Sequence, residues 1–362
     1  MPRTDALHRP LICLMLCLVL WPVAATAQTD EEKRAAMNAA YRQYQELIAQ
    51  GPQMRAQAEA PAREAYELAL EVLGDAHATT AALAMNYGNV LADGDAAARV
   101  LEQALEITEN LHGDSALELI DPLMALGDSA TAHSEFADAR GHYARALEIA
   151  ESQPEPDSFL GAIIAIQLGT TAFSLDRPRE AIENFTRARD ALAALDNDIA
   201  RVRLATANFW IGRYHIQQDA PAEAIAPLQE ALAVFERFPE ARQLSVNSLT
   251  ALVEAHETLG QRAEATPHVQ NLGMGTNAPT LVYRPAQPHA LWEQGAVEVQ
   301  LDVDAEGFVQ NVRVPEGTEP EFAAAVREAV TALRYAPRHD NGAAAATSDV
   351  RLAFQFSRPA RR

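Results

Sequence analysis

The sequence predicts a mostly α-helical protein in which an α-solenoid of helical hairpins precedes a small α+β domain. Two observations predict the solenoid: an alanine-centred motif returns with a period near 42 residues, and a glycine precedes several copies at a fixed distance. The small domain is predicted because, after residue 272, apolar residues begin to alternate with polar ones, as in half-buried strands. With 362 residues, 48% of them apolar and 22% charged, the chain is long enough for two folded domains.

The first 27 residues have the organisation of a secretory signal peptide. Two arginines precede an apolar run at 11–20, and the Ala-Thr-Ala sequence at 25–27 supplies the small residues that signal peptidase accepts before Gln28. The run is about ten residues long, whereas a membrane-spanning helix needs roughly 20 apolar residues. We therefore expect cleavage after Ala27 and a periplasmic protein. The alternative is an uncleaved segment that anchors the chain in the inner membrane, facing the periplasm.

Composition and motifs argue against an enzyme and against nucleic-acid binding. The net charge of −21 repels phosphate backbones and anionic lipid. Cys13 and Cys17 both lie in the signal segment, so the cleaved chain has no cysteine for disulfides, thiolate catalysis or metal binding. The ten histidines are dispersed without a zinc-binding pair, Lys33 is the only lysine, and Ser129 lacks the second glycine of a nucleophile elbow. The sequence therefore predicts no catalytic residue, cofactor, metal ion or small-molecule substrate.

The repeated motif is Ala-x3-[Tyr/Phe/Leu]-x2-Ala. Its five copies are Ala62/Tyr66/Ala69, Ala97/Leu101/Ala104, Ala139/Tyr143/Ala146, Ala181/Phe185/Ala188 and Ala224/Leu228/Ala231. Gly127, Gly169 and Gly212 each follow an aliphatic residue and lie twelve positions before the first alanine of the last three copies. Because spacings of three, four and seven share one helical face, and small residues let helices approach closely, each unit is predicted to be a pair of packed helices.

This arrangement resembles the tetratricopeptide repeat (TPR) over roughly residues 31–272. A period near 42 rather than 34 indicates longer helices, and the family's proline after the second helix is absent. In the copy at 80–110, Gly88 lies only nine residues before Ala97, so we expect its turn to lack three residues. A partial sixth unit is marked by Leu252, Gly260 and Ala265. An unrelated helical bundle with alanine-rich packing is the alternative.

The TPR resemblance implies a concave groove that holds peptides or partner proteins. By the family register, the groove-facing positions of the first helices include Asn89, Phe209, Arg213 and Gln217. Each of these side chains is equally explained as a packing residue or as a solvated one.

The C-terminal region predicts the order strand, strand, helix, strand. The expected elements are a linker at 273–280, strands at 297–303 and 308–314 around a turn at 304–307, a helix over 319–333, and a last strand at 350–356. The turn begins like a calcium loop, but Arg313 stands where a bidentate glutamate would be needed, so we interpret it as a hairpin turn.

This region resembles the C-terminal domain of the TonB family over about residues 281–357. The matching pieces are the prolines at 285 and 288, 295–299, 303–309, Phe322 with 324–326, 333–337 and 354–356. The sequence departs from the family at Gln287, Leu291 and Leu333, which stand where the family has tyrosine, alanine and tryptophan. The resemblance implies capture of an extended peptide by strand addition at a sheet edge.

The last strand is the candidate edge for this capture. Its residues are Val350, Arg351, Leu352, Ala353, Phe354, Gln355 and Phe356. The alternative is that the edge is already covered by a dimer mate, by residues 281–283, or by the basic tail at 358–362.

Together these features predict a periplasmic scaffold or adaptor rather than an enzyme. Its partners would be proteins or extended peptide segments, with an outer-membrane receptor among the candidates. The alternative is a membrane-tethered TonB-family energy transducer, which needs an inner-membrane helix and a proline-rich spacer, whereas the twenty prolines are scattered. The expected divisions are a signal peptide at 1–27, a TPR-like domain at 28–272, the linker, a TonB-like domain at 281–357 and the tail.

Overall fold

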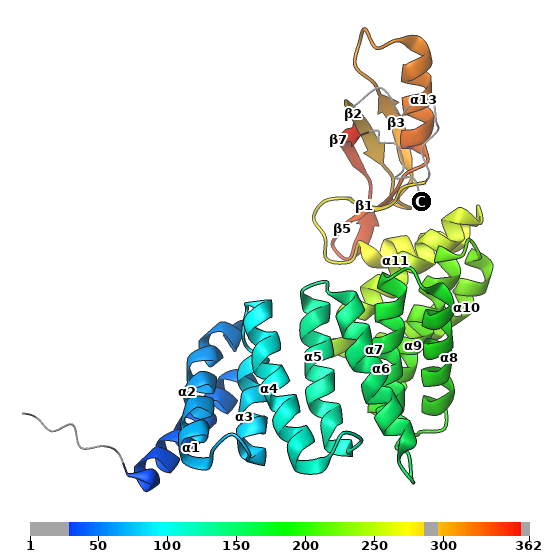
Figure 1. Cartoon of the computed structure of the whole chain (residues 1–362). Coiled ribbons are helices and arrows are strands. Elements are labelled where there is room, and N and C mark those ends of the chain that lie inside the picture. The colour runs from blue at the N-terminus through cyan, green and yellow to red at the C-terminus, as the bar shows by residue number, and fades with distance from the viewer. Residues whose placement is uncertain (1–28, 286–295, 356–362) are drawn as a thin grey trace, which may run out of the picture.

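The computed structural model describes residues 29–285 and 296–355. A row of helical hairpins ends at a small strand-containing domain, which stands on the last hairpin (Figure 1). The predictions that lie outside the described residues are the signal peptide with its cleavage after Ala27, the family positions Gln287 and Leu291, the binding role of Phe356, and the basic tail at 358–362.

Residues 29–285, which are described throughout, contain twelve α-helices that pair into six hairpins. The pairs are α1 (Asp30–Ala49) with α2 (Arg55–Leu73), α3 (Ala78–Gly88) with α4 (Gly94–His112), α5 (Ile120–Ala132) with α6 (Phe136–Ser152), α7 (Ser158–Ser174) with α8 (Pro178–Leu192), α9 (Asp198–Gln217) with α10 (Pro221–Phe235), and α11 (Arg242–Thr258) with α12 (Arg262–Leu272). The predicted solenoid is confirmed, and its sixth unit is a complete hairpin rather than a partial one.

Glycine and alanine bring the two helices of a hairpin together, as the motif predicts. The last alanine of all five copies is fully buried. A Cβ atom on Gly127 would lie 2.4 Å from the Tyr143 ring, and one on Gly169 would lie 2.6 Å from the Phe185 ring. Gly212 faces Leu228 in the same way, at 2.5 Å. Because each glycine has no side chain, it leaves a space in the first helix that the large residue of the second helix fills.

The short spacing from Gly88 to Ala97 in the second hairpin has a different reason from the one predicted. The fifth, seventh and ninth helices each continue five residues beyond their glycine, whereas α3 ends at Gly88 itself. Gly88 still packs against the second helix, because its Cβ would lie 2.7 Å from Leu101. The expectation that residues are missing from the turn is wrong: the first helix has lost its last turn, and the packing contact is kept.

One residue in a left-handed conformation ends the first helix of each of the last four hairpins. These residues are Ser134, Asp176, Asp219 and Gly260, with φ between 55° and 72°. The next residue then donates its N–H back to a carbonyl of the last helical turn, as in the 2.8 Å bond from Glu135 to Ala130 and the 2.9 Å bond from Arg177 to Ala172. This Schellman geometry satisfies carbonyls that the helix end leaves unpaired.

The C-terminal domain contains the predicted strand-strand-helix-strand core and additional short strands. The elements are β1 (Thr280–Tyr283), β2 (Ala296–Val303), β3 (Val309–Arg313), α13 (Pro320–Thr331), β4 (Arg334–Ala336), β5 (Arg338–Asp340), β6 (Ala343–Ala345) and β7 (Thr347–Gln355). Among the described strands, an antiparallel sheet has the order β3-β2-β7, while β1 pairs with β4 and β5 with β6. The fold class predicted from the sequence is confirmed.

The helix α13 covers one face of the three-stranded sheet. Val299 and Leu301 of β2 pack with Val326 and Val330 of α13, and Leu333, which replaces the family's tryptophan, is fully buried with them. At the turn, Asp304 Oδ1 accepts the N–H groups of Glu306 (3.1 Å) and Phe308 (2.8 Å). The carboxylate therefore stabilises the hairpin turn.

We expect enlargement of a buried motif alanine to destabilise the solenoid. Ala188→Leu forces an isobutyl group into a filled helix crossing, which should cost about 1–3 kcal/mol of unfolding free energy. Glu183→Gln, one turn earlier on the exposed face of α8, should leave the unfolding free energy nearly unchanged. Urea denaturation followed by circular dichroism measures both, and an Ala188→Leu protein as stable as the parent would show that the packing register is wrong.

We also expect stability to fall in mild acid because of His268. Its ring stacks on His256 with centroids 5.7 Å apart, and burial, followed by the neighbouring His256, lowers the pKa of His268 below its usual 6.5. The unfolded chain therefore binds the proton more readily, so the unfolding free energy decreases as the pH falls below about 6.5. Denaturation at pH 7.5 and 5.5 should show a smaller decrease for His268→Gln than for the parent; equal decreases would contradict this assignment.

Candidate protein-binding surfaces

Polar contacts connect the first helices of successive hairpins along the solenoid. Gln167 Nε2 of α7 donates to Asp128 Oδ1 of α5 at 3.0 Å. Arg213 of α9 forms a 2.9 Å ion pair with Glu254 of α11. These contacts place α5 beside α7 and α9 beside α11, on the side of the solenoid that the TPR resemblance assigns to partners.

The four groove candidates differ in how accessible they are. Asn89 is exposed at the C-terminal cap of α3, and its carbonyl accepts from Arg55. Gln217 and Arg213 are half-buried, and the charge of Arg213 is paired with Glu254. Phe209 is only 6% exposed and packs in the core, where its ring lies 5.4 Å from the ring of Trp210. Phe209 therefore contributes mainly to packing, and the other three remain predictions.

A hollow of about 340 Å³ between α1 and α3 was not predicted from the sequence. Its lining consists of Met37, Asn38, Tyr41, Ala78, Thr79, Ala82, Leu83 and Asn86. Met37 and Leu83 are buried, while the two asparagines and Thr79 provide amide and hydroxyl groups. No charged side chain lines it. Such a surface suits an apolar side chain of a partner, because moving a charged group into it costs desolvation energy.

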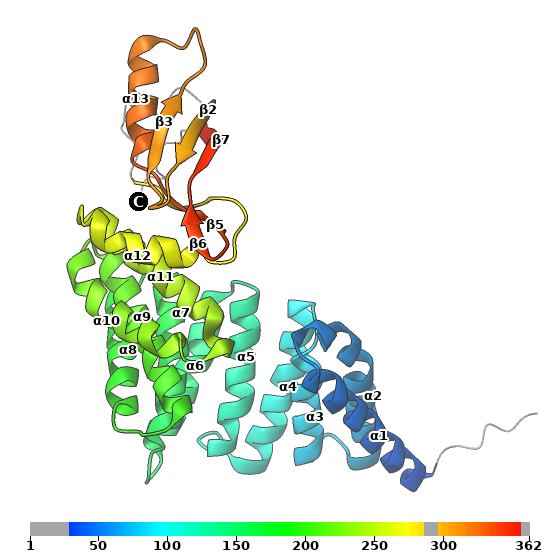
Figure 2. The ribbon, with the colours of Figure 1, turned by 180° about the vertical axis from the view of Figure 1, so that it is seen from behind.

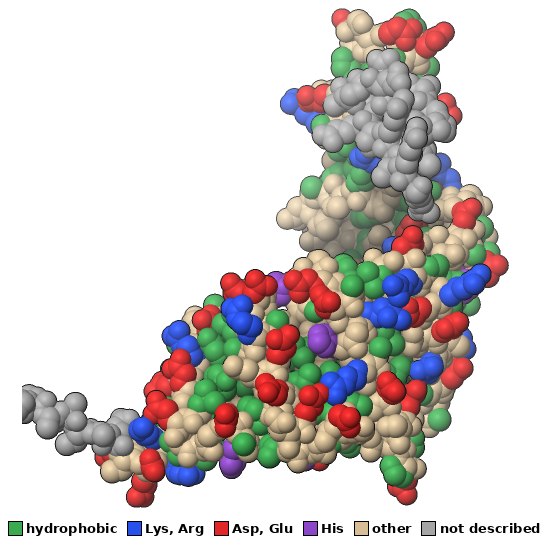
Figure 3. Space-filling view, in the orientation of Figure 1, with side chains coloured by type: hydrophobic (Ala, Val, Ile, Leu, Met, Phe, Trp, Pro, Cys, Tyr) green, Lys and Arg blue, Asp and Glu red, His purple; other side chains and the backbone are tan. Residues whose placement is uncertain are grey.

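Charge is distributed unevenly among the helices. The sequences of α3 and α7 contain no charged residue, whereas α2 and α4 carry four acidic residues each. In Figure 3, acidic and basic side chains are interspersed over the visible face of the solenoid. Most of the negative net charge therefore lies on the second helices and on the connecting segments, while the first helices together have little net charge.

The strand β7 lies at the edge of the three-stranded sheet. It pairs with β2 from Thr347 to Gln355, and no other described strand pairs with its residues 350–353. Val350 and Leu352 are half-buried toward α13, and Arg351 and Ala353 are exposed. Phe354 is fully buried in the domain core. Residues 281–283, one of the expected covers of this edge, belong to β1, which pairs with β4 instead.

A carboxylate at the centre of the sheet fixes the path of β7. Asp302 of β2 accepts from Arg313 (2.9 Å), from the Asn311 amide (2.8 Å) and from the backbone N–H of Asp349 (3.0 Å). The hydrogen bonds from Arg313 and Asn311 hold the pKa of Asp302 well below its usual range. Both pairings of β2 shift register near this residue, so Asp302 joins all three strands at their irregular point.

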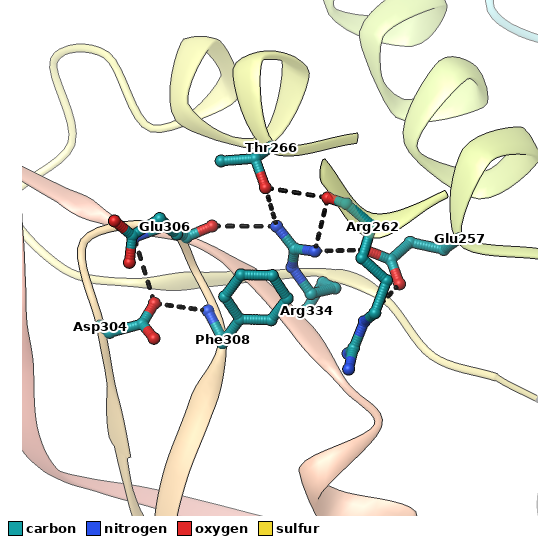
Figure 4. A network of polar contacts seen from close by, with 7 residues as sticks. All are labelled: Glu257, Arg262, Thr266, Asp304, Glu306, Phe308 and Arg334. Carbon is teal, nitrogen blue, oxygen red and sulfur yellow. Dashed lines mark hydrogen bonds and ion pairs between the residues drawn. The ribbon is translucent and has the colours of Figure 1, made fainter. Parts of the chain in front are cut away.

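The C-terminal domain meets the solenoid through a buried arginine (Figure 4). Arg334 begins β4 and is fully buried, and it forms an ion pair with Glu257 of α11, whose side chain is 3% exposed. Its Nη2 donates to Thr266 Oγ1 at 3.1 Å and to the Glu306 carbonyl at 2.9 Å. The guanidinium carbon lies 3.9 Å from the centre of the Phe308 ring. Burial lowers the pKa of Arg334, and Glu257 opposes that effect.

The predicted linker takes part in this junction. The N–H of His339 donates to the Thr276 carbonyl at 2.9 Å, and its ring Nε2 lies 3.1 Å from the Gln270 carbonyl. Gln270 Nε2 in turn donates to the Ala305 carbonyl at 3.2 Å. The segment between α12 and β1 is therefore bonded to the domain that follows it.

Arg334 was recognised in the sequence only as part of a family motif, and Glu257 was not singled out. No local signal indicates that Glu257 has a buried partner, because the residues just before it already include the acidic Glu254. Nothing in the sequence indicates that this partner lies 77 residues further along the chain.

Neither a metal-binding cluster nor a membrane-spanning helix is present in the described ranges, 29–285 and 296–355. No group of three or more His, Cys, Asp or Glu side chains there could hold a metal ion. No helix there is both long enough and apolar enough to cross a membrane.

Comparisons with known proteins identify both parts of the chain. Residues 121–194 match the family model of the tetratricopeptide repeat, and residues 282–357 match that of the Gram-negative bacterial TonB protein C-terminal. No curated protein sequence matches the chain.

Several solved structures resemble the solenoid at low sequence identity. BtubC from P. vanneervenii is 15% identical, with 72% of this chain and 98% of that chain covered and a TM-score of 0.47. PilW, a type IV pilus biogenesis factor, is 16% identical, with 65% and 91% covered and a TM-score of 0.47. Aspartyl phosphate phosphatase F from Bacillus subtilis is 14% identical, with 68% and 74% covered and a TM-score of 0.48. From the two family matches, the chain combines tetratricopeptide repeats with a TonB C-terminal domain.

Proposed function

We propose that this protein is an exported adaptor, which binds partner proteins along its solenoid and takes an extended partner segment at the edge of its C-terminal sheet. The observation that carries the proposal is the position of β7. In a domain that matches the TonB C-terminal family, residues 350–353 form an outer strand with β2 as their one described strand partner.

Strand addition suits the chemistry of this edge. Main-chain N–H and C=O groups supply the affinity, and alternate side chains add selectivity. The apolar side chains of β7 are turned to the domain core, while Arg351 and Ala353 are exposed. A partner segment would thus meet mainly backbone, so a range of extended sequences fits, including one from an outer-membrane receptor.

The solenoid offers a second and chemically different surface. Two of its first helices, α3 and α7, carry no charged residue, and the lining of the hollow between α1 and α3 includes the buried Met37 and Leu83. These features favour a partner segment with an apolar side chain at the N-terminal end of the solenoid. The sequence of residues 1–27 supports the periplasm as the place where both surfaces work.

A proline substitution in β7 tests strand addition. Arg351→Pro removes a backbone N–H, whereas Arg351→Ala removes the side chain and keeps that N–H. The partner is first identified by mass spectrometry after a pull-down from periplasm, and its binding segment is then made as a peptide. We expect Arg351→Pro to bind this peptide about tenfold more weakly and Arg351→Ala to bind it like the parent, because about one backbone hydrogen bond is lost.

The strand geometry provides a control for folding. Successive residues of a strand direct their N–H groups to opposite sides, so position 351 or 352 faces outward. If circular dichroism shows that Arg351→Pro unfolds the domain, the comparison is made with Leu352→Pro and Leu352→Ala. A folded proline variant that binds the peptide as tightly as the parent refutes strand addition and moves the site to the solenoid.

Export is tested on the protein recovered from cells. We expect intact-mass analysis and Edman degradation of a periplasmic extract to give Gln28 as the first residue, because residues 25–27 carry the small side chains that signal peptidase accepts. Recovery of a chain that begins with Met1 in inner-membrane pellets would instead support a membrane-tethered energy transducer.

A further inference from the structure

We infer that the last hairpin of the solenoid forms a preformed binding site for the side chain of Arg334. This contact holds the C-terminal domain and the solenoid in one fixed arrangement. The inference is independent of the proposed function, because it concerns a contact within the chain. Figure 2 shows the same arrangement from behind, with β5 and β6 at the end of the C-terminal domain that faces the last hairpin, where β1 contacts α11 and β4 contacts α12.

The binding site is assembled from both helices of the hairpin. Glu257 is the penultimate residue of α11, and its carboxylate receives Arg334 Nη1. The α12 helix supplies the Thr266 hydroxyl at 3.1 Å and the Arg262 carbonyl at 3.5 Å. The tight turn between the helices, with Gly260 at φ 72°, brings these groups to the same side. The result is a set of acceptors on the solenoid for both Nη groups of the planar guanidinium, whose buried Nε has no hydrogen-bond partner among the described residues.

The C-terminal domain completes the enclosure from its own side. The Phe308 ring covers one face of the guanidinium, and the Glu306 carbonyl takes the remaining Nη2 proton. Arg262 Nε lies 3.2 Å from the other oxygen of Glu257 and holds that carboxylate in place. Arg334 is therefore enclosed by two domains, and neither domain could satisfy it alone.

Close contacts at two glycines fix the position of the C-terminal domain on the solenoid, in addition to the ion pair. Gly307 has φ 88°, and a Cβ there would lie 2.1 Å from the Tyr335 carbonyl oxygen and 2.7 Å from Val269 of α12. A Cβ on Gly273, just after α12, would lie 2.2 Å from the Pro337 carbonyl oxygen. Gly273 lets the main chain of the solenoid approach the main chain of the C-terminal domain, and Gly307 leaves room for the Val269 side chain, so the domain seats in one orientation.

The cost of leaving buried charges without partners favours a contact between the two domains that is either fully formed or fully open. Separating the domains would expose Arg334 and Glu257 to water, but any partial opening would leave buried charges with incomplete partners, which is strongly unfavourable. The β4 segment that carries the TonB-family motif is consequently turned toward the solenoid. An external partner meets the C-terminal domain elsewhere, at a fixed distance from the first-helix face.

The distance between two spin labels, one in each domain, tests directly whether the domains keep one arrangement. The chain from Gln28 onward has no cysteine, so Glu183→Cys in α8 and Arg327→Cys in α13 provide two exposed labelling sites. We expect double electron-electron resonance to give one narrow distance in this labelled chain. Arg334→Ala should lose the narrow distance and give a broad distribution. Arg334→Lys should not restore it, because an ammonium group cannot fill a forked site.

Arg338→Ala is the matched control. Arg338 lies four residues after Arg334, and its contacts with the Ala346 carbonyl and Asp340 stay within the C-terminal domain. It should keep the narrow distance. Glu257→Gln is the second variant, used if Arg334→Ala does not fold, and it should also broaden the distribution. A broad distribution in the labelled parent, or a narrow one in both Glu257→Gln and a folded Arg334→Ala, would overturn the inference.

Discussion

The close approach of the two helices within a hairpin is the constraint on which most of the solenoid depends, and it requires a small residue where the helices cross. In four of its hairpins a glycine of the first helix leaves the space that a tyrosine, phenylalanine or leucine of the second helix occupies. The contact is kept even where α3 has lost its last turn. Because each hairpin then presents the same shape to the next one, the six units stack in register and carry the groups of the junction to the end of the row.

Much of the solenoid could be predicted because its determinants are local and repeated. A spacing of three, four and seven, a glycine twelve positions earlier and a turn residue recur in one stretch of sequence. The strands β4, β5 and β6 have three residues each, which is too short for an alternating pattern to be recognised. The contact between the two domains was not predicted because Glu257 and Arg334 are far apart in sequence, and no sequence pattern indicates that they form a pair.

The structure also separates two kinds of ion pair. Contacts such as Arg201 with Asp198 are exposed, and pairs of this kind contribute little to stability because water and salt screen them. The pair of Arg334 and Glu257 is shielded from solvent and surrounded by further hydrogen bonds. Buried pairs of this kind serve specificity more than net stability, so its main effect is to select one arrangement of the two domains.

The long repeat has a consequence for the area that the first-helix face can offer. The longest first helices, α1 and α9, have 20 residues and so reach about 30 Å, while neighbouring packed helices are spaced by about 8–10 Å. The other four first helices have 11 to 17 residues, and all six together give a surface on the order of 1,000 Å². One partner in a complex of standard size buries about 800 Å². The solenoid therefore has enough surface to hold a folded protein as well as a peptide, without help from the C-terminal domain.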